Sequence, residues 1–260
     1  MAISTERGAS VVEAVLSGQV ALVTGGAKRV GAAVCRLLHG AGARIMIHYR
    51  TSRAEAESLG AELNRQRPDS AGLVQADLLE ADTPQRLVEA VLARFSRLDI
   101  LVNNASSFFP TAVGGITESA WQDLMGTNLK APLFLSQAAS PELRRRQGTI
   151  VNITDIHAER PMRGYVVYSI AKAGLAALTR SLALELGPEV RVNAVAPGPV
   201  LWPEDSHWSA EIRRRIIEQV PLQRQGEPED IARAVMYLVA YAPYVTGHTI
   251  AVDGGRSVSL

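Results

Sequence analysis

The sequence predicts one α/β domain with a doubly wound parallel sheet, and three observations support this prediction. Short β-rich runs alternate with longer helical runs along nearly the whole of the 260-residue chain, as in repeated βα units. Several β-rich runs are apolar almost throughout, as in strands that are covered on both faces. No internal repeat, low-complexity tract or linker interrupts residues 18–260. We therefore expect a single domain at 18–260, preceded by a loose N-terminal segment at 1–17.

The predicted strands and helices follow one another in regular order. Strands are expected at Val20–Thr24, Arg44–Tyr49, Gly72–Gln75, Leu98–Asn103, Thr149–Thr154, Arg191–Ala196 and Thr249–Val252. Apolar residues that recur every three to four positions indicate helices. These are expected near Arg29–His39, Ser52–Arg67, Pro84–Phe95, Glu118–Ala139, Tyr165–Leu186, Ala210–Val220 and Pro228–Val239.

Composition excludes several classes of function. The net charge of +1 implies binding neither to nucleic acid nor to an anionic membrane surface. No apolar run approaches membrane-spanning length, and residues 1–17 lack the basic-then-apolar order of a signal peptide. The single cysteine, Cys35, cannot form an internal disulfide and is expected to be a buried apolar side chain. We therefore expect a cytoplasmic protein.

The first predicted turn, Thr24–Gly31, joins an apolar strand to a helix. Glycines at such a turn let the backbone approach a pyrophosphate, which the helix N-terminus then stabilises. The spacing is Thr-Gly-x3-Arg-x-Gly, with Arg29 where a middle glycine is often found. A glycine turn that binds no ligand is the alternative.

The end of the second strand indicates which dinucleotide is bound. It reads His48-Tyr49-Arg50-Thr51-Ser52. A free ribose 2′-hydroxyl calls for Asp or Glu there, whereas a 2′-phosphate calls for Arg. Since the first acid, Glu55, already lies within the next helix, Arg50 and Ser52, helped by Lys28 or Arg29, favour NADP(H) over NAD. Alternatively, Arg50 is a solvated surface cation.

Tyr168 and Lys172 stand four residues apart in a predicted helix, and therefore on one helix face. An ammonium beside a phenol favours phenolate and lowers the tyrosine pKa. Such a phenol can give a proton to a carbonyl or imine that receives a hydride. An ordinary surface pair is the alternative.

Three further polar positions are candidates. Asp77 could accept a hydrogen bond from an adenine amino group, or cap the following turn. The small and amide residues at Asn104-Ala105-Ser106 allow a ligand to pass close to the chain. Asn128, in the middle of a predicted helix, is either exposed or bonded to the backbone, where it could bend the helix and hold a water molecule.

In this order and spacing, Thr24–Gly31, Asn103-Asn104-Ala105, Asn128, Tyr168-x3-Lys172 and Pro197-Gly198 resemble the short-chain dehydrogenase/reductase family over residues 18–255. The resemblance implies a Rossmann-type sheet of seven strands, a nicotinamide cofactor and usually a homotetramer. It also implies a tetrad of Asn, Ser, Tyr and Lys, and places Val252–Gly255 near a subunit interface.

One position departs from the family pattern, because Asp155 stands where the serine is expected. Together with Arg29, His48-Tyr49-Arg50 and the run Asn104–Thr111, this aspartate resembles the pteridine reductase branch. That resemblance implies that Arg29 contacts cofactor phosphate and substrate, and that Phe108 covers one face of a pterin. Core packing is the alternative for Phe108, and Phe109 is given no role.

A carboxylate beside Tyr168 raises the phenol pKa and opposes Lys172. Either Asp155 is held protonated and joins a proton relay, or Lys172 and the nicotinamide charge outweigh it. The hypothesis is hydride transfer from NADPH to a pterin C=N, with protonation through Tyr168 and Asp155; dihydrobiopterin, dihydromonapterin and dihydrofolate are candidate substrates. The alternatives are a carbonyl reductase, for example of 3-oxoacyl thioesters, and a non-catalytic NADP(H)-binding regulator.

The expected site falls into three overlapping groups. The catalytic residues are Asn128, Asp155, Tyr168 and Lys172. The substrate is expected to meet Arg29, Ser106, Phe108, Asp155 and Tyr168. NADPH is expected to meet Gly25, Lys28, Arg29, Val30, Tyr49, Arg50, Ser52, Asp77, Leu78, Asn104, Ala105, Ser106, Tyr168, Lys172, Pro197 and Gly198.

The segment from Leu201 to about Pro221 is the expected substrate lid. It carries Trp202, His207 and Trp208. His207 and His248 have no companion at metal-ligand spacing, so no metal is expected.

Overall fold

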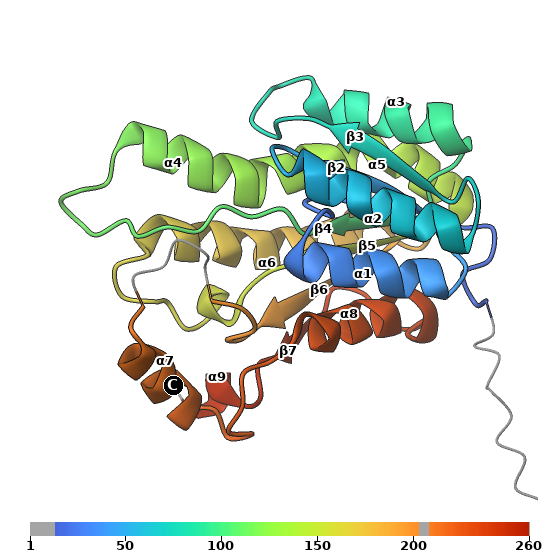
Figure 1. The fold of residues 1–260 in the computed structure, drawn as a ribbon. Coiled ribbons are helices and arrows are strands. Elements are labelled where there is room, and N and C mark those ends of the chain that lie inside the picture. Colours follow the sequence, from blue (N-terminus) through green and yellow to red (C-terminus); the bar gives the residue numbers. More distant parts are fainter. Residues whose placement is uncertain (1–13, 203–207, 260) are drawn as a thin grey trace, which may run out of the picture.

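Seven parallel strands form one sheet in the order β3-β2-β1-β4-β5-β6-β7 (Figure 1). The structure is a computed structural model that describes residues 14–202 and 208–259, so most of the predicted N-terminal segment lies outside it. The strands are β1 (Val20–Val23), β2 (Arg44–Tyr49), β3 (Ala71–Gln75), β4 (Ile100–Asn103), β5 (Thr149–Ile153), β6 (Arg191–Pro197) and β7 (Thr249–Val252). Each predicted strand is confirmed to within two residues, and so is the doubly wound parallel sheet.

Helices cover both faces of the sheet. The cluster on one face includes residues of α1 (Arg29–Gly40), α2 (Arg53–Gln66) and α8 (Pro228–Met236). The cluster on the other includes residues of α3 (Thr83–Phe95), α5 (Ala131–Arg146) and α6 (Val166–Leu186). The remaining helices are α4 (Glu118–Met125), α7 (Ala210–Glu218), α9 (Arg256–Ser259) and a short 3₁₀ turn, Ile156–Ala158. None of the helices described is long and apolar enough to cross a membrane.

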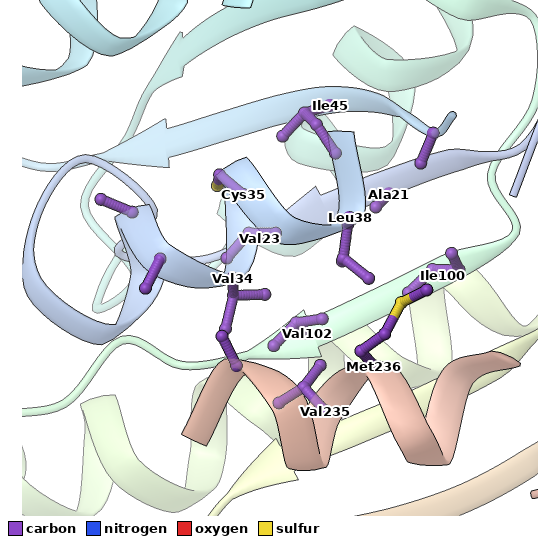
Figure 2. Packing of buried hydrophobic residues seen from close by; sticks show 14 of the residues in the cluster. Ala21, Val23, Val34, Cys35, Leu38, Ile45, Ile100, Val102, Val235 and Met236 are labelled. Atoms are coloured by element: carbon purple, nitrogen blue, oxygen red, sulfur yellow. The ribbon is translucent and has the colours of Figure 1, made fainter. Parts of the chain in front are cut away.

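Successive residues of the apolar strands belong to the two cores in alternation. Ala21 and Val23 of β1 belong to the core under α1, whereas Val20 and Leu22 belong to the core under α3 and α5. Successive strand residues point to opposite faces, so a strand with helices on both sides must be apolar at every position. In Figure 2, Leu38 of α1 and Met236 of α8 point into the same core.

Cys35 behaves as the sequence predicts. It is fully buried in the core between α1 and the sheet, and its thiol donates to the Gly26 carbonyl over 3.6 Å. Burial raises the pKa of this thiol above its ordinary value, because the charged thiolate is not solvated there.

The predicted helix Glu118–Ala139 is wrong in its continuity and in its end. A π turn, Gly126–Lys130, separates α4 from α5, and α5 continues through Pro141 to Arg146. Proline removes the N–H that would bond the carbonyl four residues back. Ser140 compensates, since its hydroxyl donates to the Gln137 carbonyl at 2.9 Å. In the same way α8 passes into a π turn, Tyr237–Tyr241, and the helical segment extends beyond the predicted Val239.

The strand order places the carboxyl ends of β1 and β4 side by side at the point where the winding reverses. In open α/β sheets, ligands bind in the crevice outside the carboxyl ends at such a switch point. The turns after β1, β2, β3, β4, β5 and β6 all open onto this edge. The fold therefore gathers the predicted site residues from distant parts of the chain.

Candidate active site

A cavity of ≈ 990 Å³ lies along the carboxyl ends of the strands. Its size is at the upper end of the range for ligand pockets, about 300–1,000 Å³, as expected for a site that holds a nucleotide and a second ligand. Every predicted site residue except Asn128 lines it. Among residues that the sequence analysis left without a role, His48, Met162, Tyr165 and Arg256 line it as well.

The glycine turn is tied to the end of β4. The Asn104 side-chain amide donates to the carbonyls of Thr24, at 2.8 Å, and Gly25, at 3.0 Å. In return, the Thr24 hydroxyl accepts from the backbone N–H groups of Asn104 and Ala105. A Cβ on Gly31 would lie 2.2 Å from the Gly25 carbonyl oxygen, so only glycine fits there. This close backbone packing is what a phosphate-binding turn requires, and the residues present therefore fit a dinucleotide.

Arg29 takes a glycine-like backbone conformation. Its φ is 56°, in the left-handed region that L-residues with large side chains rarely adopt. This agrees with its place at the position of the middle glycine. Such a conformation costs about 1–3 kcal/mol and persists at sites where function requires it. The Arg29 guanidinium donates to the Trp202 carbonyl at 3.1 Å, which connects the turn to the predicted lid.

The residues after β2 and β3 line the same cavity. Arg50 is exposed and Tyr49 is buried, while Ser52 precedes α2 without a side-chain capping bond. The Asp77 carboxylate accepts from the Leu79 N–H at 3.0 Å, which confirms the turn-capping interpretation of this residue. Its contact with adenine stays a prediction.

Tyr168, Asp155 and Lys172 meet in the interior beside β5. The Tyr168 hydroxyl donates to Asp155 Oδ2 at 2.7 Å, and Asp155 Oδ1 accepts from the His157 N–H at 2.8 Å. Lys172 Nζ donates to the Ile153 carbonyl at 2.9 Å and lies 5.7 Å from the centre of the Tyr168 ring. Tyr168 and Lys172 are only 4% and 2% exposed. Water therefore screens the charges of Lys172 and Asp155 poorly here.

The expected lowering of the Tyr168 pKa by Lys172 is wrong for this arrangement. Burial, and after it the negative charge of Asp155, raise the pKa of the phenol well above its ordinary value. Burial also lowers the pKa of Lys172 to about 8, although Asp155 opposes the shift. The site therefore favours a neutral phenol, which keeps its proton available for transfer.

A pH dependence follows from the Lys172 shift. Because its pKa is about 8, Lys172 is an ammonium below that pH and loses its charge as the pH rises. We expect turnover to fall above pH 8, because loss of the ammonium removes the positive charge that stabilises the phenolate left after proton transfer. The phenol, whose pKa is higher, stays protonated there and does not cause the fall. In Lys172→Arg, whose guanidinium keeps its proton, the residual turnover should not fall in this range. A pH–rate profile up to pH 10 checks this, and a profile that is flat in the wild type contradicts it.

Asn128 lies one layer behind the cavity wall and is fully buried. Its amide donates to the carbonyls of Leu124, at 2.9 Å, and Ser107, at 3.0 Å, while its oxygen accepts from the Ser106 hydroxyl at 2.6 Å. Of the two alternatives for this amide, exposure and bonding to the backbone, the structure shows the second, and Asn128 sits within the π turn. Its catalytic role stays a prediction. It holds the segment that carries Ser106 and Phe108.

Phe108 belongs to an aromatic cluster with Tyr165 and Tyr168. Tyr165 stacks on it with ring centres 4.7 Å apart, and Tyr168 meets it edge-on at 4.8 Å. Tyr165 was missed in the sequence, although its place three residues before Tyr168 was a signal. Aromatic faces of this kind pack favourably on flat conjugated rings.

Part of the predicted lid lines the cavity. The rings of Trp202 and Trp208 lie 5.6 Å apart, and the Arg213 guanidinium lies over Trp202. His207 falls outside the described residues. After β6, Gly198 lines the cavity and packs closely on Asp253, since a Cβ there would lie 2.6 Å from that residue. In the part of the chain that the structure describes, His, Cys, Asp and Glu form no group that could hold a metal ion.

The chain is similar to known reductases over most of its length. A protein-family model described as enoyl-(acyl carrier protein) reductase matches residues 25–257. Pteridine reductase 1 of Leishmania tarentolae is 39% identical over an alignment of 281 positions, which takes in 92% of this chain and 96% of that protein. The 3-oxoacyl-[acyl-carrier-protein] reductase of Staphylococcus aureus is 35% identical over 238 residues, which cover 90% and 96%.

Proposed function

The chain belongs to the short-chain dehydrogenase/reductase family, and on that basis we propose that it is an NADPH-dependent reductase of pterins. Membership of the family makes it an oxidoreductase that uses a nicotinamide cofactor. The choice among substrates rests on one observation above all, the hydrogen bond from Tyr168 to the carboxylate of Asp155. The similarity to a named pteridine reductase supports this choice.

The residues around the cofactor support NADPH as the reductant. Arg50 and Ser52 follow β2 at the cavity wall, and no acidic residue lies between Tyr49 and α2. A guanidinium there favours the 2′-phosphate of NADPH, whereas NADH calls for a carboxylate. When bound, NADPH supplies the hydride for the reduction.

The chain's own residues would orient the substrate and supply the proton. Phe108 offers an aromatic surface next to the Tyr168 ring, on which a flat pterin ring can stack. The hydroxyl carries the proton that the ring nitrogen needs once the neighbouring carbon has been reduced. Asp155, at 2.7 Å from that hydroxyl, holds it in place and takes part in the proton relay, with water near Asp155 as a second proton source.

Asp155→Ala should depress turnover far more than NADPH binding. We expect kcat to fall about 10²-fold or more, as for loss of a group in acid–base catalysis, because the variant loses the acceptor that orients the Tyr168 hydroxyl. The NADPH dissociation constant should stay within about threefold of the wild-type value, which is less than one hydrogen bond is worth. Steady-state kinetics and cofactor titration measure the two effects. Equal losses in both would remove the assigned role of Asp155.

A carbonyl reductase is the second candidate, favoured by the similarity to a 3-oxoacyl reductase. Optical measurement of NADPH oxidation with 7,8-dihydrobiopterin, and separately with an acetoacetyl thioester, separates the two. Turnover on the pterin alone supports the proposed function. Turnover on the thioester alone favours the second candidate. Binding of NADPH without turnover on either substrate leaves a different substrate or a non-catalytic regulator.

The proposed assembly is a homotetramer, as family resemblance implies. Light scattering should then give a mass four times that of the 27.9 kDa chain.

A further inference from the structure

His48 is a buried side chain at the carboxyl end of β2 that the proposed function leaves unused. It is 2% exposed. Its Nδ1 lies 3.2 Å from the Gly25 N–H nitrogen, and its Nε2 lies 3.2 Å from the Ala76 carbonyl oxygen. Since a carbonyl only accepts, Nε2 carries the proton and Nδ1 is the acceptor for Gly25. Both ring nitrogens are therefore used.

These bonds join three segments that carry predicted NADPH-binding residues at the cavity wall. Gly25 opens the glycine turn, Ala76 precedes Asp77, and His48 itself precedes Tyr49 and Arg50. A backbone hydrogen bond also joins the glycine turn to the end of β2, because the Gly26 N–H donates to the His48 carbonyl at 2.9 Å. Gly25 has a φ of 59°, in the left-handed region that favours glycine.

We infer that His48 is a positioning residue that sets the glycine turn in the geometry required to bind the dinucleotide. It acts through Gly25 and does not itself contact the phosphates. The inference rests on the nucleotide part of the proposed function and is independent of which substrate is reduced.

The charge state of the ring agrees with this role. Burial lowers the pKa of His48 to about 4, although the bond to the Ala76 carbonyl and the charge of Asp77 oppose the shift, so the ring is neutral near pH 7. A neutral ring can accept from one backbone group and donate to another, whereas a protonated ring would turn a donor toward the Gly25 N–H.

Two substitutions separate the two bonds. In His48→Asn the side-chain oxygen can take the place of Nδ1 and accept from Gly25, but nothing reaches Ala76. In His48→Gln the amide nitrogen can take the place of Nε2 and donate to Ala76, but the acceptor for Gly25 is lost. Each variant keeps one bond of two, so both should lower the melting temperature of the nucleotide-free protein by similar amounts.

The NADPH dissociation constant, measured by nucleotide fluorescence without substrate, is the decisive readout. We expect His48→Gln to weaken binding about tenfold, the value of one backbone hydrogen bond, and His48→Asn to stay within about threefold. Equal dissociation constants in the two variants would overturn the inference, because a purely structural histidine would not distinguish them.

A measurement on the wild-type protein makes the test independent of variant folding. Nitrogen-15 NMR of labelled histidine should show His48 with its proton on Nε2 near pH 7. The opposite tautomer would overturn the inference. Failure of the proposed function is seen separately, as absent turnover on the pterin while the ratio of dissociation constants persists.

Discussion

Tyr168→Phe should lower pterin turnover by about 10²–10⁴-fold, the range for loss of a positioned general acid. The phenyl ring can keep the edge contact with Phe108 at 4.8 Å, so the cavity wall should keep its shape. What is lost is the hydroxyl that donates to Asp155 at 2.7 Å and carries the proton. NADPH affinity should therefore change little, and kcat and the NADPH dissociation constant should be measured together.

Tyr244→Phe is the matched control. Tyr244 is fully exposed and lies outside the cavity, so removing its hydroxyl should leave both constants unchanged. If Tyr168→Phe keeps wild-type turnover, the phenol is not the proton donor and the proposed chemistry fails.

Gly31→Ala should weaken NADPH binding by about 10- to 100-fold, which corresponds to an overpacking cost of about 1–3 kcal/mol. The added Cβ would lie 2.2 Å from the Gly25 carbonyl oxygen and 2.7 Å from the Asn104 side-chain nitrogen. A backbone carbonyl cannot swing aside as the end of a flexible side chain can. The turn must therefore shift, and with it the N–H groups that would hold the pyrophosphate. Titration with NADPH and a melting curve measure the two consequences.

Gly40→Ala provides the same chemical change at the other end of α1. Nothing lies within 4 Å of a Cβ built there, and alanine is the better helix former by about 1 kcal/mol. This variant should bind NADPH normally and melt no lower than the wild type. Unchanged binding in Gly31→Ala would mean that the turn can relax without loss of the nucleotide site.

Local patterns in the sequence were sufficient for the strands, the glycine turn and the Tyr168–Lys172 pair. The run Val20–Val23 is apolar at every position, which already implies a strand between two helical layers. Tyr168 and Lys172 share a helix face because helical spacing is a local property of the backbone. The sequence also places Arg29 where a middle glycine is often found, and the structure gives it a glycine-like φ of 56°.

The tertiary structure decided what depends on burial and on contacts between distant segments. His48 is 23 residues from Gly25 and 28 from Ala76, and no local pattern pairs them. The direction of the Tyr168 shift also came from the fold, because burial and Asp155 outweigh an ammonium that bonds the Ile153 carbonyl. The periodicity of apolar residues can be read from the local sequence. The burial of a side chain and the distances between strands are fixed only once the sheet has formed.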